Sequence, residues 1–339
     1  MKILLTGGAG YIGSHTAIAL VKSGHEVVIA DNFSNSHHLV IARLEGLCER
    51  QIRNYQIDVA NQLDLEEICR KENFEAVIHF AGLKAVSESV NKPLLYYGVN
   101  LSTTLSLCAV MLDLGIRNLV FSSSATVYGE PERIPLDEHC RANNANNPYG
   151  RTKSFIEQIL KDLQATQPLM NIALLRYFNP AGAHASARIG EDPKGPPNNL
   201  IPILTRVAAK KLKEVVIYGD DYDTPDGTCV RDFIHVHDLA EGHVAALTKL
   251  VTNPGLVTYN LGTGQGRSVS EVVDTFERTT GVELKKRVGP RRPGDVVSAY
   301  CDPALAEREL NWRARLDIED ICRDAWLWQQ QNPHGYQPS

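Results

Sequence analysis

The 339-residue sequence lacks paired cysteines, low-complexity tracts and any excess of positive charge. Its seven cysteines are widely spaced without a C-x-x-C pair, which argues against a disulfide framework or a cysteine zinc site and favours a reducing compartment. Lys and Arg number 35 against 40 Asp and Glu, a net charge of −5, which argues against nucleic-acid binding. Residues 1–5 run directly into a glycine cluster and leave no room for a signal peptide. We therefore expect a cytoplasmic protein.

Charged side chains are missing from one stretch, residues 93–112, which raises the question of a membrane span. The stretch contains Gly98, Asn100 and several hydroxyl side chains, and these argue against insertion into lipid. We expect instead a buried helix, or a helix that faces another subunit, and no membrane partner.

Short apolar runs alternate with segments of helical periodicity along the first half of the chain. The runs predict buried strands at 2–6, 27–30, 76–80, 118–121 and 172–175, and the helical segments lie at 12–23, 63–72, 94–114 and 149–163. This alternation predicts a Rossmann-type, doubly wound parallel sheet of the α/β class. From about residue 180 the elements become shorter and richer in Gly and Pro, which predicts a smaller α/β lobe. We divide the chain into 1–180 and 181–339, with an approximate boundary that allows for strand exchange.

A glycine-rich turn connects the first predicted strand to the first predicted helix. Gly7, Gly10 and Gly13 allow a tight turn, close approach of a pyrophosphate, and close packing of helix and strand. Asp31 ends the second strand, where it can accept hydrogen bonds from an adenosine ribose and disfavour a 2′-phosphate. These features predict dinucleotide binding with NAD preferred over NADP. Asp58 follows the third strand and is either an adenine-facing side chain or a loop carboxylate.

The strongest candidate for a catalytic motif is Tyr149-x-x-x-Lys153. It places a phenol and an ammonium on one face of a helix that starts near Pro148. A tyrosine titrates near pH 10 in water, so it needs a nearby positive charge to act as a base at neutral pH. Ser122, Ser123 and Ser124 follow the preceding strand, and a hydroxyl there can hydrogen-bond a reacting oxygen. We expect Lys153, together with a positively charged nicotinamide ring, to lower the pKa of Tyr149. The phenol, the ammonium and a serine hydroxyl are therefore the candidate catalytic groups.

In their order along the chain, these motifs resemble the extended short-chain dehydrogenase/reductase family, and most closely its bacterial UDP-hexose 4-epimerases. The resemblance covers essentially the whole chain. It rests on TGGAGYIG from residue 6, HFAGLKA from 79, SSSATVYG from 122, LLRYFNPAGAH from 174, RDFIHVHDLA from 231, YNLGTG from 259 and RRPGD from 291.

The resemblance implies an NAD-dependent isomerase. Tyr149 would take the proton of the sugar 4-hydroxyl while hydride leaves C4, the 4-keto sugar would turn over, and the hydride would return to its other face. Lys153 would lower the Tyr149 pKa and Ser124 would polarise the 4-oxygen. The resemblance also implies a homodimer, a UDP-sugar partner and a place in galactose metabolism or polysaccharide precursor supply.

The family's binding residues carry over position by position. Those implied for NAD are Gly7, Gly10, Tyr11, Ile12, Gly13, Asp31, Asn32, Asp58, Val59, Phe80, Ala81, Lys84, Ser124, Tyr149, Lys153 and Phe178. Those implied for the UDP-sugar are Ser124, Tyr149, Asn179, Asn199, Leu200, Tyr218, Arg231, Arg292, Asp295 and Ala299. Arg231 and Arg292 are forked cations suited to a diphosphate, and their alternative is a solvated salt-bridge face.

Two positions depart from the family pattern. Val99 stands where an amide usually contacts the cofactor, so one NAD hydrogen bond is lost or supplied by a neighbour. Ala299 stands where members restricted to glucose carry a bulky tyrosine, which leaves room for an acetamido group. We expect activity on UDP-GlcNAc and UDP-GalNAc as well, unless Tyr300 or another side chain fills the space.

Three other functions are alternatives to an epimerase. A nucleotide-sugar 4,6-dehydratase needs an Asp-Glu pair after the serine strand, where this chain has Ala125 and Thr126. A related decarboxylase or reductase is the second alternative. A non-catalytic NAD-sensing scaffold is the third, and it would be expected to lack Tyr149. His235 and His237 lack further ligands at suitable spacing, so we expect no metal site.

Overall fold

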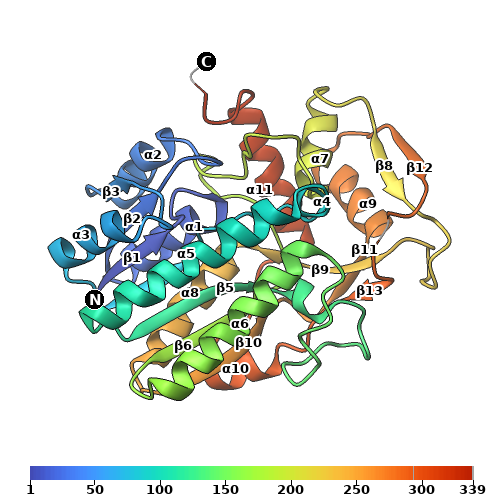
Figure 1. Ribbon diagram of the computed structural model, residues 1–339. Coiled ribbons are helices and arrows are strands. Elements are labelled where there is room, and N and C mark those ends of the chain that lie inside the picture. Colours follow the sequence, from blue (N-terminus) through green and yellow to red (C-terminus); the bar gives the residue numbers. More distant parts are fainter. Residues whose placement is uncertain (293, 338–339) are drawn as a thin grey trace.

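A seven-stranded parallel sheet forms the centre of the molecule in the computed structural model, which describes residues 1–292 and 294–337 (Figure 1). Its strand order is β10-β6-β5-β4-β1-β2-β3, so the chain winds outward in both directions from the middle of the sheet. This confirms the predicted doubly wound fold. The strands are β1 (Lys2–Thr6), β2 (Glu26–Asp31), β3 (Arg53–Gln56), β4 (Ala76–His79), β5 (Asn118–Ser124), β6 (Asn171–Tyr177) and β10 (Leu256–Leu261).

Helices cover both faces of this sheet, which explains why its strands are apolar at successive positions. Along β1, Ile3 and Leu5 contribute to one apolar cluster, whereas Leu4 contributes to the opposite one. The first cluster includes α1 (Tyr11–Lys22), α2 (Leu39–Cys48) and α8 (Val236–Leu250), and the second includes α3 (Gln62–Glu72), α5 (Pro93–Leu114) and α6 (Pro148–Thr166). A short helix α4 (Val86–Asn91) and a 3-10 turn η1 (Ala125–Tyr128) follow β4 and β5.

The remaining elements form a smaller α/β lobe with its own apolar core. Strand β9 (Val230–His235) is its centre and pairs with β7 (Asn179–Ala181), β11 (Gly266–Ser268) and β13 (Ser298–Ala299). Strands β8 (Val215–Tyr218) and β12 (Lys286–Gly289) form a separate parallel pair. Three helices contribute to this core, namely α7 (Leu200–Ala208), α9 (Val269–Thr280) and α11 (Ile318–Gln331).

Three elements from the second half of the chain pack on the first sheet or its helices. Helix α10 (Ala304–Leu310) lies against α8 and β10. Strand β10 pairs in parallel with β6 through Leu256–Leu261, and α8 packs against α1. The chain therefore leaves the large sheet after β6, builds part of the small lobe, and returns to add a strand. The division at residue 180 itself stays a prediction.

Helix α5 is the charge-poor segment singled out in the sequence. By length and composition alone it could cross a membrane, because a window within Pro93–Leu114 has a mean hydropathy of 1.3. It packs between α3 and α6, and 44% of that window is buried within the protein. Several of its leucines nevertheless face outward, and Leu94 is 85% exposed.

Three fully enclosed histidines predict that acid destabilises the fold. Burial lowers the pKa of His15 and of His79 to about 3, and the pKa of His243 to about 4. Between these values and 6.5 the unfolded chain binds more protons than the folded chain, so stability falls as the pH falls. Each histidine contributes on the order of 1.4 kcal/mol per pH unit in that window. Urea unfolding at pH 7.5, 6.0 and 5.0 measures the effect, and equal stability at all three values would contradict it.

Candidate active site

The turn between β1 and α1 has the close packing that the glycine pattern predicts. Gly7 has a positive φ of 69°, and a Cβ there would lie 2.7 Å from the backbone nitrogen of Ala81. A Cβ on Gly13 would lie 2.7 Å from the carbonyl oxygen of Gly7. Side chains are therefore excluded at Gly7 and Gly13, and the N–H groups at the start of α1 remain accessible to an anion. This cradle fits the pyrophosphate of a dinucleotide.

Asp31 lies at the carboxyl end of β2 and is 7% exposed. Its carboxylate accepts hydrogen bonds from Ala9 N at 3.0 Å, Phe33 N at 2.8 Å and Ser36 Oγ at 3.0 Å. A carboxylate offers about four acceptor positions, so roughly one remains for a ribose hydroxyl. Asp31 thus fixes the glycine turn to β2 in addition to its predicted binding role.

The other cofactor candidates lie at the same edge of the sheet or close to it. Asp58 is exposed and accepts a hydrogen bond from Ala60 N, the arrangement of a loop carboxylate, whereas Val59 is buried. The Tyr11 hydroxyl donates to Gly182 O at 2.7 Å, and Lys84 Nζ lies 5.7 Å from the Tyr11 ring centroid. The remaining candidates are Ile12, Asn32 beyond β2, Phe80 and Ala81 beyond β4, and Phe178 beyond β6.

Helix α6 carries the phenol and the ammonium. It starts at Pro148, and the side chain of Asn147 caps it by accepting a hydrogen bond from Gly150 N at 2.9 Å. Lys153, one turn after Tyr149, points inward and its Nζ donates to Ser122 O at 2.6 Å. Ser124 is the last residue of β5, so the same strand holds the lysine and presents the serine.

Burial is the main influence on the pKa values of Tyr149 and Lys153. It raises the pKa of Tyr149, and the Ser124 hydroxyl only partly opposes that effect. The Lys153 ammonium lies 6.0 Å from the Tyr149 ring centroid, and burial lowers its own pKa to about 8. The predicted lowering of the Tyr149 pKa by Lys153 together with a positively charged nicotinamide ring stays a prediction.

A buried ion pair, not predicted from the sequence, holds α6 against the sheet. Glu157 and Arg176 are 2% and 3% exposed, and they form two hydrogen bonds at 2.7 and 3.0 Å. Glu157 also accepts from Ser123 Oγ at 2.6 Å. The pair therefore links α6, β5 and β6, the three elements around the catalytic group. An arginine in the middle of the apolar run LLRYF was the available signal.

Asn100 is a second residue that the sequence analysis missed as part of the site. Its side-chain amide accepts from Leu83 N at 2.7 Å and donates to Leu83 O at 3.1 Å and to Thr152 Oγ1 at 2.9 Å. It thus fixes the turn before Lys84 to the catalytic helix. The adjacent Val99 is only half-buried and supplies no such contact.

The residues proposed for a nucleotide sugar gather around β8, β9 and β13. The Arg292 guanidinium lies 3.9 Å from the centre of the Tyr218 ring. Arg231 forms an ion pair with Asp295 at 3.4 Å and pairs in register with Ala299. Both arginines therefore lie near Asp295, and two guanidinium groups close together are suited to bind a diphosphate. Pro293, in the RRPGD motif, lies outside the described residues.

Other candidates come from the connections between the two lobes. Asn179 begins β7, and Asn199 and Leu200 lie at the start of α7. His235 caps α8, because its Nδ1 accepts a hydrogen bond from His237 N at 3.0 Å. The His-x-His pattern therefore has a structural role.

The Glu157–Arg176 pair predicts a specific pattern of stability changes. Glu157→Gln or Arg176→Met leaves one charge buried without its partner and should lower the free energy of unfolding by about 3–5 kcal/mol. The double variant Glu157→Leu with Arg176→Met should recover much of that loss.

Urea unfolding measures all three variants. Glu66→Gln, which removes an exposed pair with Arg70, is the matched control and should cost less than about 1 kcal/mol. A loss for Glu157→Gln no larger than that of the control would contradict the assigned role.

Comparison with known proteins places this fold and site in one class. The profile of the NAD-dependent epimerase/dehydratase family matches residues 3–262. The chain belongs to this family.

Individual relatives narrow the assignment. The UDP-glucose 4-epimerase of Bacillus subtilis is 51% identical over 336 residues, 99% of each chain, and that of Mus musculus is 50% identical over 341 residues, 99% of this chain and 98% of the relative. A crystal structure of UDP-glucose 4-epimerase from Bifidobacterium longum in complex with NAD+ and UDP has a TM-score of 0.96 and 48% identity, covering 99% of this chain and 100% of that one. Within the family, the chain groups with the UDP-glucose 4-epimerases.

Proposed function

We propose that the chain interconverts UDP-glucose and UDP-galactose by inverting C4 of the sugar. The observation that carries this proposal is the convergence of Tyr149, Lys153 and Ser124 at the carboxyl edge of the sheet, beside the glycine cradle. NAD held by that cradle supplies a reversible acceptor for the hydride at C4. The complex of the Bifidobacterium longum relative with NAD+ and UDP supports the choice of both ligands.

In this proposal the chain's own residues handle the proton. Tyr149 Oη accepts the proton of the sugar 4-hydroxyl and returns it after the sugar has turned over. Because burial raises the Tyr149 pKa, the phenol needs the combined positive charge of Lys153 and the nicotinamide ring to become a base at neutral pH. Ser124 orients the 4-oxygen by a hydrogen bond.

The rest of the site supplies binding and orientation. Arg231 and Arg292 hold the diphosphate, with Tyr218, Asn179, Asn199, Leu200 and Asp295 around them. Lys84 and Asp31 hold the dinucleotide. Because the 4-keto sugar must turn over between two hydride transfers, the anchoring contacts fall on the UDP moiety and leave the sugar free to rotate.

We propose a second activity on UDP-GlcNAc and UDP-GalNAc. Ala299 pairs in register with Arg231 in a parallel ladder, so both side chains lie on one face of the sheet. A Cβ on Gly266 would lie 2.8 Å from the ring of Tyr300 and 2.7 Å from Val230, which places the Tyr300 ring on the opposite face. Tyr300 therefore does not occupy the space beside Ala299, which supports room for an acetamido group there.

The 4,6-dehydratase alternative is less well supported. Elimination of water needs an acid and a base just after β5, and that position is the turn η1, where Ala125 and Thr126 stand. Neither side chain can exchange protons at neutral pH. The presence of Tyr149 and Lys153 likewise disfavours a non-catalytic scaffold.

We also propose a homodimer formed through α5 and α6. Large apolar side chains on these two helices remain exposed, namely Leu94, Leu95, Leu105, Leu112 and Phe155. Tyr97 of α5 stacks on Phe155 of α6 with ring centroids 6.0 Å apart, which makes the apolar surface continuous across both helices. A surface of this kind is typical of a subunit interface.

Tyr149→Phe removes the proton acceptor and keeps the ring. Turnover of UDP-galactose to UDP-glucose should fall by roughly 100- to 10,000-fold, while NAD remains bound. A coupled assay of UDP-glucose, with the NAD content of the purified protein measured alongside, tests this. Wild-type turnover by the variant would contradict the role of Tyr149.

Ala299→Tyr fills the proposed acetamido space. It should abolish epimerisation of UDP-GlcNAc while epimerisation of UDP-glucose changes by less than about tenfold, because only the larger substrate clashes. Assays of both substrate pairs on wild type and variant decide the matter. Negligible turnover of UDP-GlcNAc by the wild type would contradict the second activity.

Leu105→Glu combined with Phe155→Glu should convert the dimer to a monomer at micromolar concentration, because burying two carboxylates in the interface is costly. Sedimentation velocity measures the mass. Leu63→Glu on α3, where the leucine is 77% exposed, is the control and should leave the dimer intact. A dimer that survives in the double variant would contradict the assigned interface.

A further inference from the structure

Glu191 lies in the connection between β7 and α7, and its carboxylate joins the two proposed binding sites. One oxygen, Oε1, accepts a hydrogen bond from Lys84 Nζ at 2.9 Å and another from Asn199 Nδ2 at 3.2 Å. Lys84 is the lysine proposed to hold the cofactor, and Asn199 is proposed to hold the UDP-sugar. The Glu191 side chain is only 9% exposed although the Lys84 side chain is 44% exposed.

The residues that follow Glu191 make further links between the same two regions. The backbone N–H of Lys194 donates to Asn35 Oδ1 at 3.1 Å, and its Nζ donates to Phe33 O at 2.5 Å. Asn35 and Phe33 belong to the loop that Asp31 begins at the proposed ribose site. Lys194 therefore attaches the connection to the cofactor side of the molecule.

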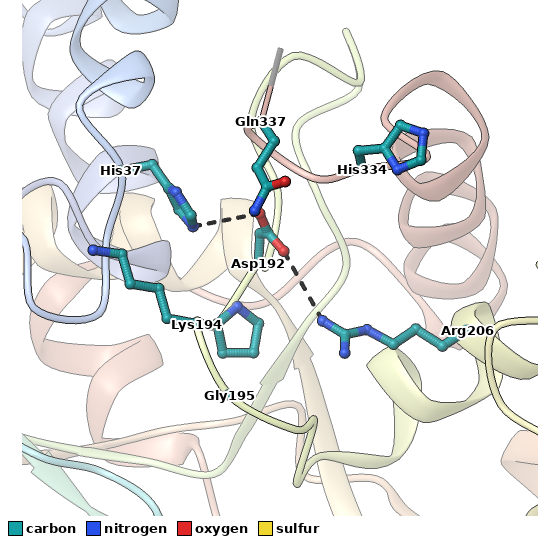
Figure 2. A pocket seen from close by; sticks show the side chains of 8 residues that line it. His37, Asp192, Lys194, Gly195, Arg206, His334 and Gln337 are labelled. Carbon is teal, nitrogen blue, oxygen red and sulfur yellow. Dashed lines mark ion pairs between the residues drawn. The ribbon is translucent and has the colours of Figure 1, made fainter. Parts of the chain in front are cut away.

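Asp192 attaches the connection to the substrate side as well. Figure 2 shows it between His37 and Arg206, whose ring Nε2 and guanidinium nitrogen lie 3.5 and 3.9 Å from the Asp192 carboxylate. His37 continues the cofactor loop, and Arg206 belongs to α7, the helix that begins next to Asn199. These side chains line a cavity of about 470 Å³ at the junction of the two lobes. Glu191 and Asp192 thus contact both regions, and Lys194 contacts the cofactor side.

We infer that Glu191 is a positioning residue that couples binding of the UDP-sugar to retention of NAD. When Asn199 engages the nucleotide sugar, the start of α7 is fixed, and the shared carboxylate oxygen is fixed with it. Lys84 is then held toward the dinucleotide instead of sampling solvent. By reciprocity, bound NAD strengthens UDP binding by the same factor. This inference rests on the proposed function only for the assignment of Lys84 and Asn199.

A purely structural role for Glu191 makes a different prediction. Loss of a partly exposed ion pair would change stability by about 1 kcal/mol or less and would affect NAD exchange equally with and without UDP. The coupling role changes the ratio of the two exchange rates. That ratio is therefore the quantity to measure.

The experiment follows exchange of the bound cofactor of the holoenzyme against an excess of isotopically labelled NAD, with and without saturating UDP. In the wild type, UDP should slow exchange by about fivefold or more, the usual lower range of coupling between sites. In Glu191→Leu the ratio should fall to about one. In Glu191→Gln, which keeps the shape but loses the charge, it should fall to less than half the wild-type ratio.

Glu319→Gln is the matched control, because Glu319 pairs with Arg278 at 2.8 Å between α9 and α11 and touches neither site. It should keep the wild-type ratio. An unchanged ratio in both Glu191 variants, or an equal loss in the control, would overturn the inference. So would a wild-type exchange rate that UDP does not alter.

Failure of the proposed function is detected separately. The wild-type assay with UDP-galactose tests epimerisation without reference to Glu191. If turnover is present and the exchange ratios are unchanged by the variants, the coupling is wrong and the proposed function stands. If turnover is absent but UDP slows exchange in a Glu191-dependent way, the coupling stands and the proposed function is wrong.

Discussion

The attachment of α6 to the large sheet is the constraint on which the site depends. Glu157 binds Arg176 on β6 and Ser123 on β5, and the Lys153 ammonium is held by a carbonyl of β5. Tyr149 and Ser124 lie at the ends of these same elements, so their relative position follows from contacts made one and two turns deeper in the protein. A buried pair is weak evidence for net stability, but breaking it leaves a charge without a partner, which disfavours other positions of α6 on the sheet.

Burial sets the starting point for the proposed chemistry, because it raises the pKa of Tyr149 and lowers that of Lys153 to about 8. In the proposed mechanism, the positive charges of Lys153 and of the nicotinamide ring lower the pKa of the phenol again. Tyr149 would then act as a base in the protein that holds its cofactor.

The local patterns predicted the fold well, because each reports a local physical requirement. The glycine turn, the strand runs buried on both faces and the start of α6 at Pro148 could all be predicted from neighbouring residues. Contacts between distant segments could not. Examples are the contacts of Asn100 with Leu83, of Glu157 with Arg176, and of Glu191 with Lys84 and Asn199. In each case the fold brings together segments that are not neighbours in the sequence. The sequence analysis allowed for strand exchange between the lobes, but it did not identify β10 as the strand that returns to the large sheet.

The central claim is that the hydrogen removed from C4 returns to the same carbon while Tyr149 handles only the hydroxyl proton. The most direct measurement uses UDP-galactose with deuterium at C4, converted by the holoenzyme in ordinary water and analysed by mass spectrometry. The account predicts that the UDP-glucose formed retains essentially all of the deuterium at C4. Loss of the deuterium to solvent would mean that C4 is inverted by proton exchange, and it would contradict the account.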